Sequence, residues 1–137
     1  MARTTINVYS AQTLPTTYSP SVQIAMTDLS GTTWQSLTLQ LTVQNNGSVI
    51  MPGHELKLHW AFLQTSITAA NALTGIIPDG TVIGCPDLNP NINSGTAIIV
   101  SPVINVTADY LYTWLEVCEA DANYANVEVS LDAVQTQ

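Results

Sequence analysis

The strongest constraint on this fold is the alternation of apolar and polar residues in three short stretches. In residues 36–43, SLTLQLTV, apolar side chains occupy every second position and polar ones lie between them. Residues 55–62 (ELKLHWAF) and 125–134 (ANVEVSLDAV) repeat the pattern. Successive side chains of a β-strand point to opposite faces, so each stretch predicts a half-buried strand.

Further strands are predicted by weaker patterns, and helical signals are nearly absent. About eight strands separated by loops rich in Gly, Pro, Asn and Asp predict an all-β antiparallel β-sandwich, and we expect a jelly roll. Pro102 interrupts one apolar run, which favours an edge strand, a bulge or two short strands there. The single helix candidate is residues 66–75, SITAANALTG. The weaker strands are residues 4–10, 21–27, 80–85, 97–106 and 110–118.

The length of 137 residues fits one domain, which we assign to residues 21–137, preceded by an N-terminal segment at 1–20. Within that segment, residues 10–20 (SAQTLPTTYSP) are polar, contain two prolines and show no alternation. An ordinary surface loop is one interpretation. The other is an extended arm on a neighbouring subunit, with Leu14 and Tyr18 as its apolar anchors.

Charge excludes two classes of partner. The chain has two basic residues against ten acidic ones, a formal net charge of −8. Binding to nucleic acid or to an anionic membrane needs several Lys or Arg side chains, so we expect neither. No apolar run reaches the ~18 residues of a membrane span, and the first residues do not resemble a secretory signal. We therefore expect synthesis in a cytoplasm.

The cysteine content does not predict a disulfide framework. Cys85 and Cys118 are too few for one, and disulfides are rare in proteins made and kept in a cytoplasm. We expect two free, buried thiols.

One loop has a partial calcium-binding pattern. In residues 87–95, DLNPNINSG, oxygen-bearing side chains occupy alternate positions, as in the first half of an EF-hand loop. The pattern fails where Gly and Glu would be needed, because Ile92 and Ile98 stand there. We expect a turn built on Asn and Pro.

No other metal, cofactor or catalytic pattern is evident. His54 and His59 are five residues apart and would face opposite sides of one strand. The nucleophile motif G-x-S-x-G is absent. An acidic cluster near the C-terminal hairpin is more typical of a solvated surface than of a catalytic carboxylate pair. We therefore expect neither an enzyme nor a cofactor; the cluster comprises Glu116, Glu119, Asp121 and Glu128.

The stretch YLYTWLEVC (110–118) predicts a strand buried on both faces. Tyr110, Tyr112 and Trp114 share one face, and residues 111, 113, 115 and 117 share the other. We expect the second sheet to cover one face. The other would meet a neighbouring chain or a cap formed by the SITAANAL segment, which makes the three aromatics candidate interface residues. They are alternatively a platform for stacking on sugars.

The sequence as a whole resembles the capsid decoration, or cement, proteins of tailed bacteriophages that have small β-sandwich or jelly-roll folds. The resemblance rests on the segment ARTTINVYSAQTLPTTYSP, on Thr-, Asn- and Ser-rich strands, on the near absence of lysine and on the final VEVSLDAV. It implies a homotrimer on the virion capsid surface that binds the major capsid protein and stabilises an icosahedral head. It carries over no catalytic or binding residue. A carbohydrate- or receptor-binding module and a tail or neck protein remain the alternatives.

Overall fold

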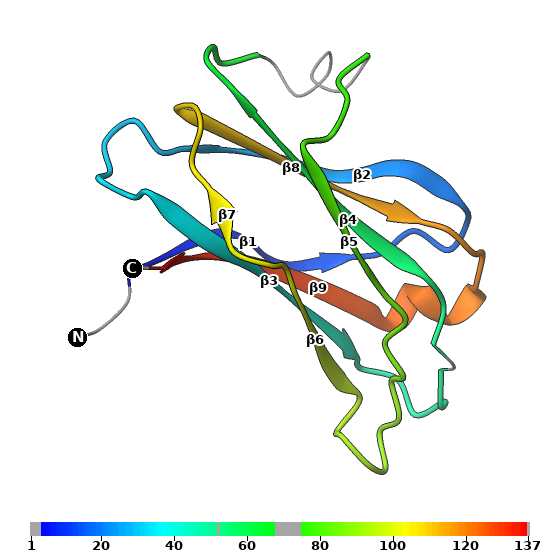
Figure 1. Ribbon diagram of the computed structural model, residues 1–137. Helices are drawn as coiled ribbons and strands as arrows, with labels where there is room; N and C mark the ends of the chain where they lie inside the picture. Colours follow the sequence, from blue (N-terminus) through cyan, green and yellow to red (C-terminus); the bar gives the residue numbers. More distant parts are fainter. Residues whose placement is uncertain (1–3, 52, 68–74, 137) are drawn as a thin grey trace.

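The computed structural model describes residues 4–51, 53–67 and 75–136, which form a sandwich of two antiparallel β-sheets (Figure 1). Its strands are β1 (Thr5–Thr13), β2 (Ser19–Asp28), β3 (Ser36–Asn45), β4 (Leu56–Leu63), β5 (Gly80–Gly84), β6 (Thr96–Val100), β7 (Ile104–Asn105), β8 (Tyr110–Val117) and β9 (Val127–Thr136). A short 3₁₀ helix, η1 (Ala122–Asn126), leads into β9.

The strand order is that of a jelly roll. The first sheet has the order β1-β9-β3-β6, with β7 also paired to β3, and the second has the order β2-β8-β4-β5. The chain changes sheets at nearly every connection, with β4 to β5 and β6 to β7 as the exceptions. This interleaving of a five-stranded and a four-stranded sheet confirms the predicted all-β antiparallel sandwich of jelly-roll type.

The core lies between the sheets and follows the predicted alternation. In β3 the four apolar side chains at alternate positions are fully buried, and β4 and β9 repeat this arrangement. Phe62, at the end of β4, is only partly buried against the core. Burying one such side chain contributes about 1.5–3 kcal/mol, so these alternating faces supply much of the stability. The fully buried residues of β3 are Leu37, Leu39, Leu41 and Val43.

The N-terminal region is built into the sandwich from residue 5. Strand β1 pairs along β9, and β2 begins the second sheet at Ser19, so the expected division at residue 20 does not follow the structure. Both strands contain register shifts, two in β1 and two in β2. A bulge adds a residue to one strand and breaks the period of two, and residues 14–18 are the connection between β1 and β2. Residues 10–20 therefore show no alternation.

Local structure differs from expectation in one further place. Helix η1 was not predicted; Asp121 caps its N-terminus by accepting a hydrogen bond from the backbone N–H of Asn123. The predicted helix at 66–75 falls largely on residues 68–74, which lie outside the described residues. In the parts of the chain that are described, no helix is long and apolar enough to cross a membrane.

Two glycines let the edge strand β5 approach the core closely. A Cβ at Gly80 would lie 2.2 Å from Cζ2 of Trp60, and a Cβ at Gly84 would lie 2.5 Å from Cδ1 of Ile99. The Trp60 ring, on the neighbouring strand β4, therefore occupies the space that a side chain at residue 80 would need.

We expect Gly80→Ala to destabilise the fold by about 1–3 kcal/mol, because the added methyl group forces a packed indole ring to move. Urea unfolding measures the change. Gly31→Ala is the matched control, since a Cβ there meets nothing within 4 Å, and it should leave stability nearly unchanged. Equal effects of the two substitutions would contradict the packing at Trp60.

Candidate functional site: the outer face of the second sheet and the β5/β6 rim

The chain itself covers the outer face of β8 at Tyr112. The Tyr112 side chain is 1% exposed and packs with Ala61, Ile67 and Ile76. Its hydroxyl accepts a hydrogen bond from the backbone N–H of Ile67 at 2.6 Å and lies 3.1 Å from the Ile67 carbonyl oxygen. The expected burial of β8 on both faces is therefore present within one chain. Of the expected SITAANAL cap, Ile67 contacts Tyr112, whereas residues 68–74 lie outside the described residues.

Trp114 is covered by a histidine. The His59 ring stacks on the Trp114 ring with centroids 5.4 Å apart and an interplanar angle of 27°, and Trp114 is 6% exposed. The His59 ring is held by Thr81 Oγ1 at 2.7 Å and by Glu116 Oε1 at 3.0 Å. Tyr112 and Trp114 therefore do not form the open platform that stacking on a sugar would require.

The other predicted interface residues have different environments. Tyr110 is partly buried beside the Tyr112 cluster. Leu14 is 2% exposed and belongs to the core of its own chain, so its side chain is not available to a neighbour. Tyr18 is 56% exposed and is the one of these five residues that is open to solvent.

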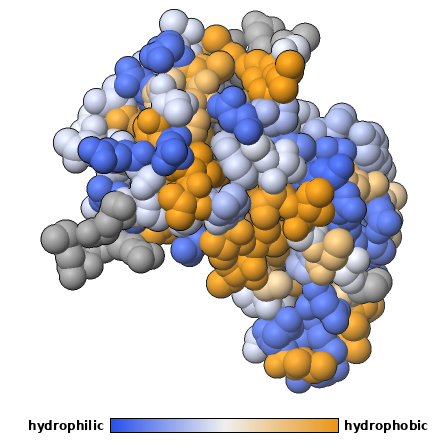
Figure 2. Space-filling view, viewed as in Figure 1, coloured by the Kyte–Doolittle hydropathy of each residue, from blue (hydrophilic) through white to orange (hydrophobic). Residues whose placement is uncertain are grey.

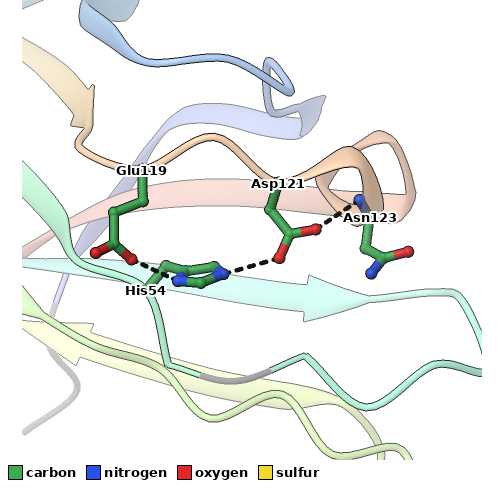
Figure 3. Close-up of polar contacts among 4 residues, drawn as sticks. All are labelled: His54, Glu119, Asp121 and Asn123. Atoms are coloured by element: carbon green, nitrogen blue, oxygen red, sulfur yellow. Dashed lines mark hydrogen bonds and ion pairs between the residues drawn. The ribbon is translucent and has the colours of Figure 1, made fainter.

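His54 meets two residues of the acidic cluster, Glu119 and Asp121, at one end of the second sheet (Figure 3). His54 Nδ1 lies 2.5 Å from Glu119 Oε2, and His54 Nε2 lies 2.8 Å from Asp121 Oδ2. His54 comes from the connection between β3 and β4, whereas both carboxylates come from the connection between β8 and β9. The imidazole therefore ties two loops together.

The local electrostatics favour charge on Asp121. The backbone N–H of Asn123 donates to its carboxylate at 2.8 Å, and this bond, aided by His54, holds the pKa of Asp121 below its usual range. The Tyr124 ring packs edge-on against His54 with centroids 6.0 Å apart. Burial raises the pKa of Tyr124 to about 12, so it stays neutral at physiological pH.

Both ring nitrogens of His54 are engaged in joining the two loops. Both ring nitrogens of His54 face carboxylates, so neither is free to take a proton from a substrate in this arrangement. Across residues 4–51, 53–67 and 75–136 no group of three or more His, Cys, Asp or Glu side chains is arranged to hold a metal ion. Glu128, also in the predicted acidic cluster, lies in β9 of the other sheet.

The calcium-like loop uses its polar side chains on its own backbone. Asn89 Oδ1 accepts from the N–H of Asn91 at 2.9 Å. Asn93 Oδ1 accepts from the N–H of Gly95 at 3.1 Å, and Asn93 Nδ2 donates to the carbonyl of Asp87 at 2.9 Å. These side chains act as the turn-forming groups expected of Asn in loops.

The cysteines are free, as expected, but they are not buried. Cys85 is exposed and Cys118 is partly buried. Cys85 directly follows β5, an edge strand, so it lacks a neighbouring strand to cover it. Burial, reinforced by nearby carboxylates, raises the pKa of the Cys118 thiol, which disfavours the reactive thiolate.

A surface feature that the sequence did not reveal lies where β5 and β6 form the edges of the two sheets. Residues 82–86 and 97–100, here called the β5/β6 rim, line a shallow groove of about 350 Å³. Ile83, Ile98 and Val100 are 57%, 59% and 50% exposed. Figure 2 shows hydrophobic surface gathered in the middle of the view, where Figure 1 places these two strands.

No family model, curated protein or solved structure matches this chain.

We expect the charge of Asp121 to stabilise the fold above about pH 4, the ordinary Asp pKa in unfolded chains. Because the folded-state pKa is lower, this stabilisation should be lost as the pH falls further through that lowered value. Asp121→Asn keeps an oxygen for the helix cap but removes the charge, so wild type should exceed it in stability at pH 5, and the difference should shrink toward pH 2. Urea unfolding across this range measures both proteins.

Asp109→Asn makes the same change of net charge at an exposed loop position and serves as the control. A pH-independent difference between wild type and Asp121→Asn would contradict the electrostatic role of Asp121.

Proposed function

We propose that this chain is a structural virion protein, which decorates and stabilises an icosahedral phage capsid as a homotrimer bound to the major capsid protein. The observation that carries the proposal is the β5/β6 rim, an exposed apolar surface on an otherwise acidic protein. Contiguous exposed apolar surface on a soluble protein usually marks a site of protein contact.

The jelly-roll connectivity supports the proposal by analogy. Jelly rolls are frequent in viral capsid proteins and also in lectins, so the fold alone does not select between them. The aromatic side chains that would serve a lectin-like platform, Tyr112 and Trp114, are covered by the chain's own residues. The exposed apolar side chains of the β5/β6 rim are aliphatic instead, which suits contact with protein better than stacking on sugar rings.

The charge of the chain suits the outside of a particle filled with DNA. A trimer would carry −24, from three copies at −8 each. Such a coat repels the packaged genome and other particles, and it keeps particles dispersed in solution. Decoration needs contact surfaces and no reaction, which agrees with a histidine cluster whose two ring nitrogens are already engaged.

The test is to delete the gene from the phage proposed to encode the chain and to examine purified heads. We expect wild-type heads to contain the chain in a fixed ratio to the major capsid protein, measured by quantitative mass spectrometry. Heads without it should assemble but rupture at a lower temperature, and added purified protein should restore the original value. Heads incubated in buffer alone are the control. Absence of the chain from purified heads, or its presence only in tails, would overturn the proposal.

A further inference from the structure

The two open sides of the sandwich differ in how their edges are protected. On one side β1 and β2 are the edge strands, and each contains two register shifts. Ala11 in β1 and Gln23 in β2 both have a φ of 51°, a backbone conformation that interrupts a regular edge. Bulges of this kind are a common device that prevents another chain from adding a strand.

The β5/β6 side lacks these devices. Strand β5 pairs with β4 without a register shift from Gly80 to Gly84, and β6 pairs with β3 in the same way from Thr96 to Val100. No other strand in the described part of the chain pairs with the free edge of either. The two strands, GTVIG and TAIIV, contain no proline and no charged residue. Regular, apolar and uncharged edges are those that accept another strand.

We propose that the β5/β6 rim is the contact surface between copies of this chain, which associate edge to edge through main-chain hydrogen bonds and through Ile83, Ile98 and Val100. The inference deepens the proposed function, on which it rests, because it locates the self-association that a decorating trimer requires.

The lack of charge favours a second copy of the chain over a cationic partner as the occupant of the β5/β6 rim. The chain carries −8, and the rim residues 82–86 and 97–100 include no Asp, Glu, Lys or Arg. Copies of one acidic chain repel wherever their carboxylates meet, so an uncharged surface is where they can approach closely. A basic partner would instead be drawn to the acidic surfaces elsewhere, such as that around Glu119 and Asp121.

The geometry also suits a closed ring. The rim presents two different edges side by side, β5 from the second sheet and β6 from the first. When this side faces a rotation axis, β5 of one copy can meet β6 of the next, a head-to-tail contact that closes at a fixed number of copies. All open edges on this side are then paired, and none remains for uncontrolled aggregation.

The test is sedimentation velocity of the purified full-length chain at micromolar concentration. We expect wild type to sediment as an oligomer and Ile98→Lys to weaken association by about 30-fold or more, the effect of losing a hot-spot residue. Ile98→Glu should act in the same direction as Ile98→Lys, because either charge must be desolvated, although they change the net charge oppositely. Ile83→Lys tests the other edge of the rim.

Ile77→Lys is the matched control, because Ile77 is 84% exposed but lies outside the rim, and it should remain an oligomer. Circular dichroism and thermal melting identify any variant that fails to fold, and the remaining rim variants then decide the result. A monomeric wild type, or folded rim variants that all associate as wild type does, would overturn the inference. The proposed function fails separately: the chain would then associate through the rim but be absent from phage heads.

Discussion

Burial of β8 on both of its faces is the constraint on which the second sheet depends. Its inward side chains, at 111, 113, 115 and 117, are fully buried against the first sheet. Its outward side chains Tyr112 and Trp114 are buried as well, and a strand so apolar would be an aggregation hazard if either face were open. In the jelly-roll order β8 lies between β2 and β4, and Ile67 contacts Tyr112 on its outer face.

Basic side chains of the described residues gather at and beside β4, the neighbour of β8. His54, Lys57 and His59 lie within six residues of each other, at or beside β4, and each is next to a carboxylate. Lys57 is partly buried, and Glu116 on the neighbouring strand raises its pKa. Most of these carboxylates come from β8 and the loop after it, so polar contacts continue along the outer face where the apolar cover ends. The remaining acids are largely unopposed, which leaves the chain with its net charge of −8.

The sequence predicted those parts of the fold whose signals are local. Strands β3, β4 and β9 show uninterrupted alternation, and their buried faces are the expected ones. The bulged strand β1 was partly hidden because its register shifts break the period. The sequence did not decide whether a neighbouring chain or a cap covers Tyr112, because the cover depends on a contact with Ile67, 45 residues away. The rim was missed for a related reason: its lack of charge is visible in the sequence, but its exposure follows from strand order, which alternation does not encode. The exposure of Cys85 has the same origin.

One chain covers both faces of β8 without help from a neighbour. Native-state amide hydrogen exchange of residues 110–117 tests it most directly, when measured at concentrations above and below those at which the protein associates. We expect these amides to exchange only through global unfolding, with protection that does not change on dilution to the monomer. Protection of β8 that disappears on dilution, while the inward-facing strand β3 stays protected, would show that a neighbouring chain supplies the cover and would contradict the account.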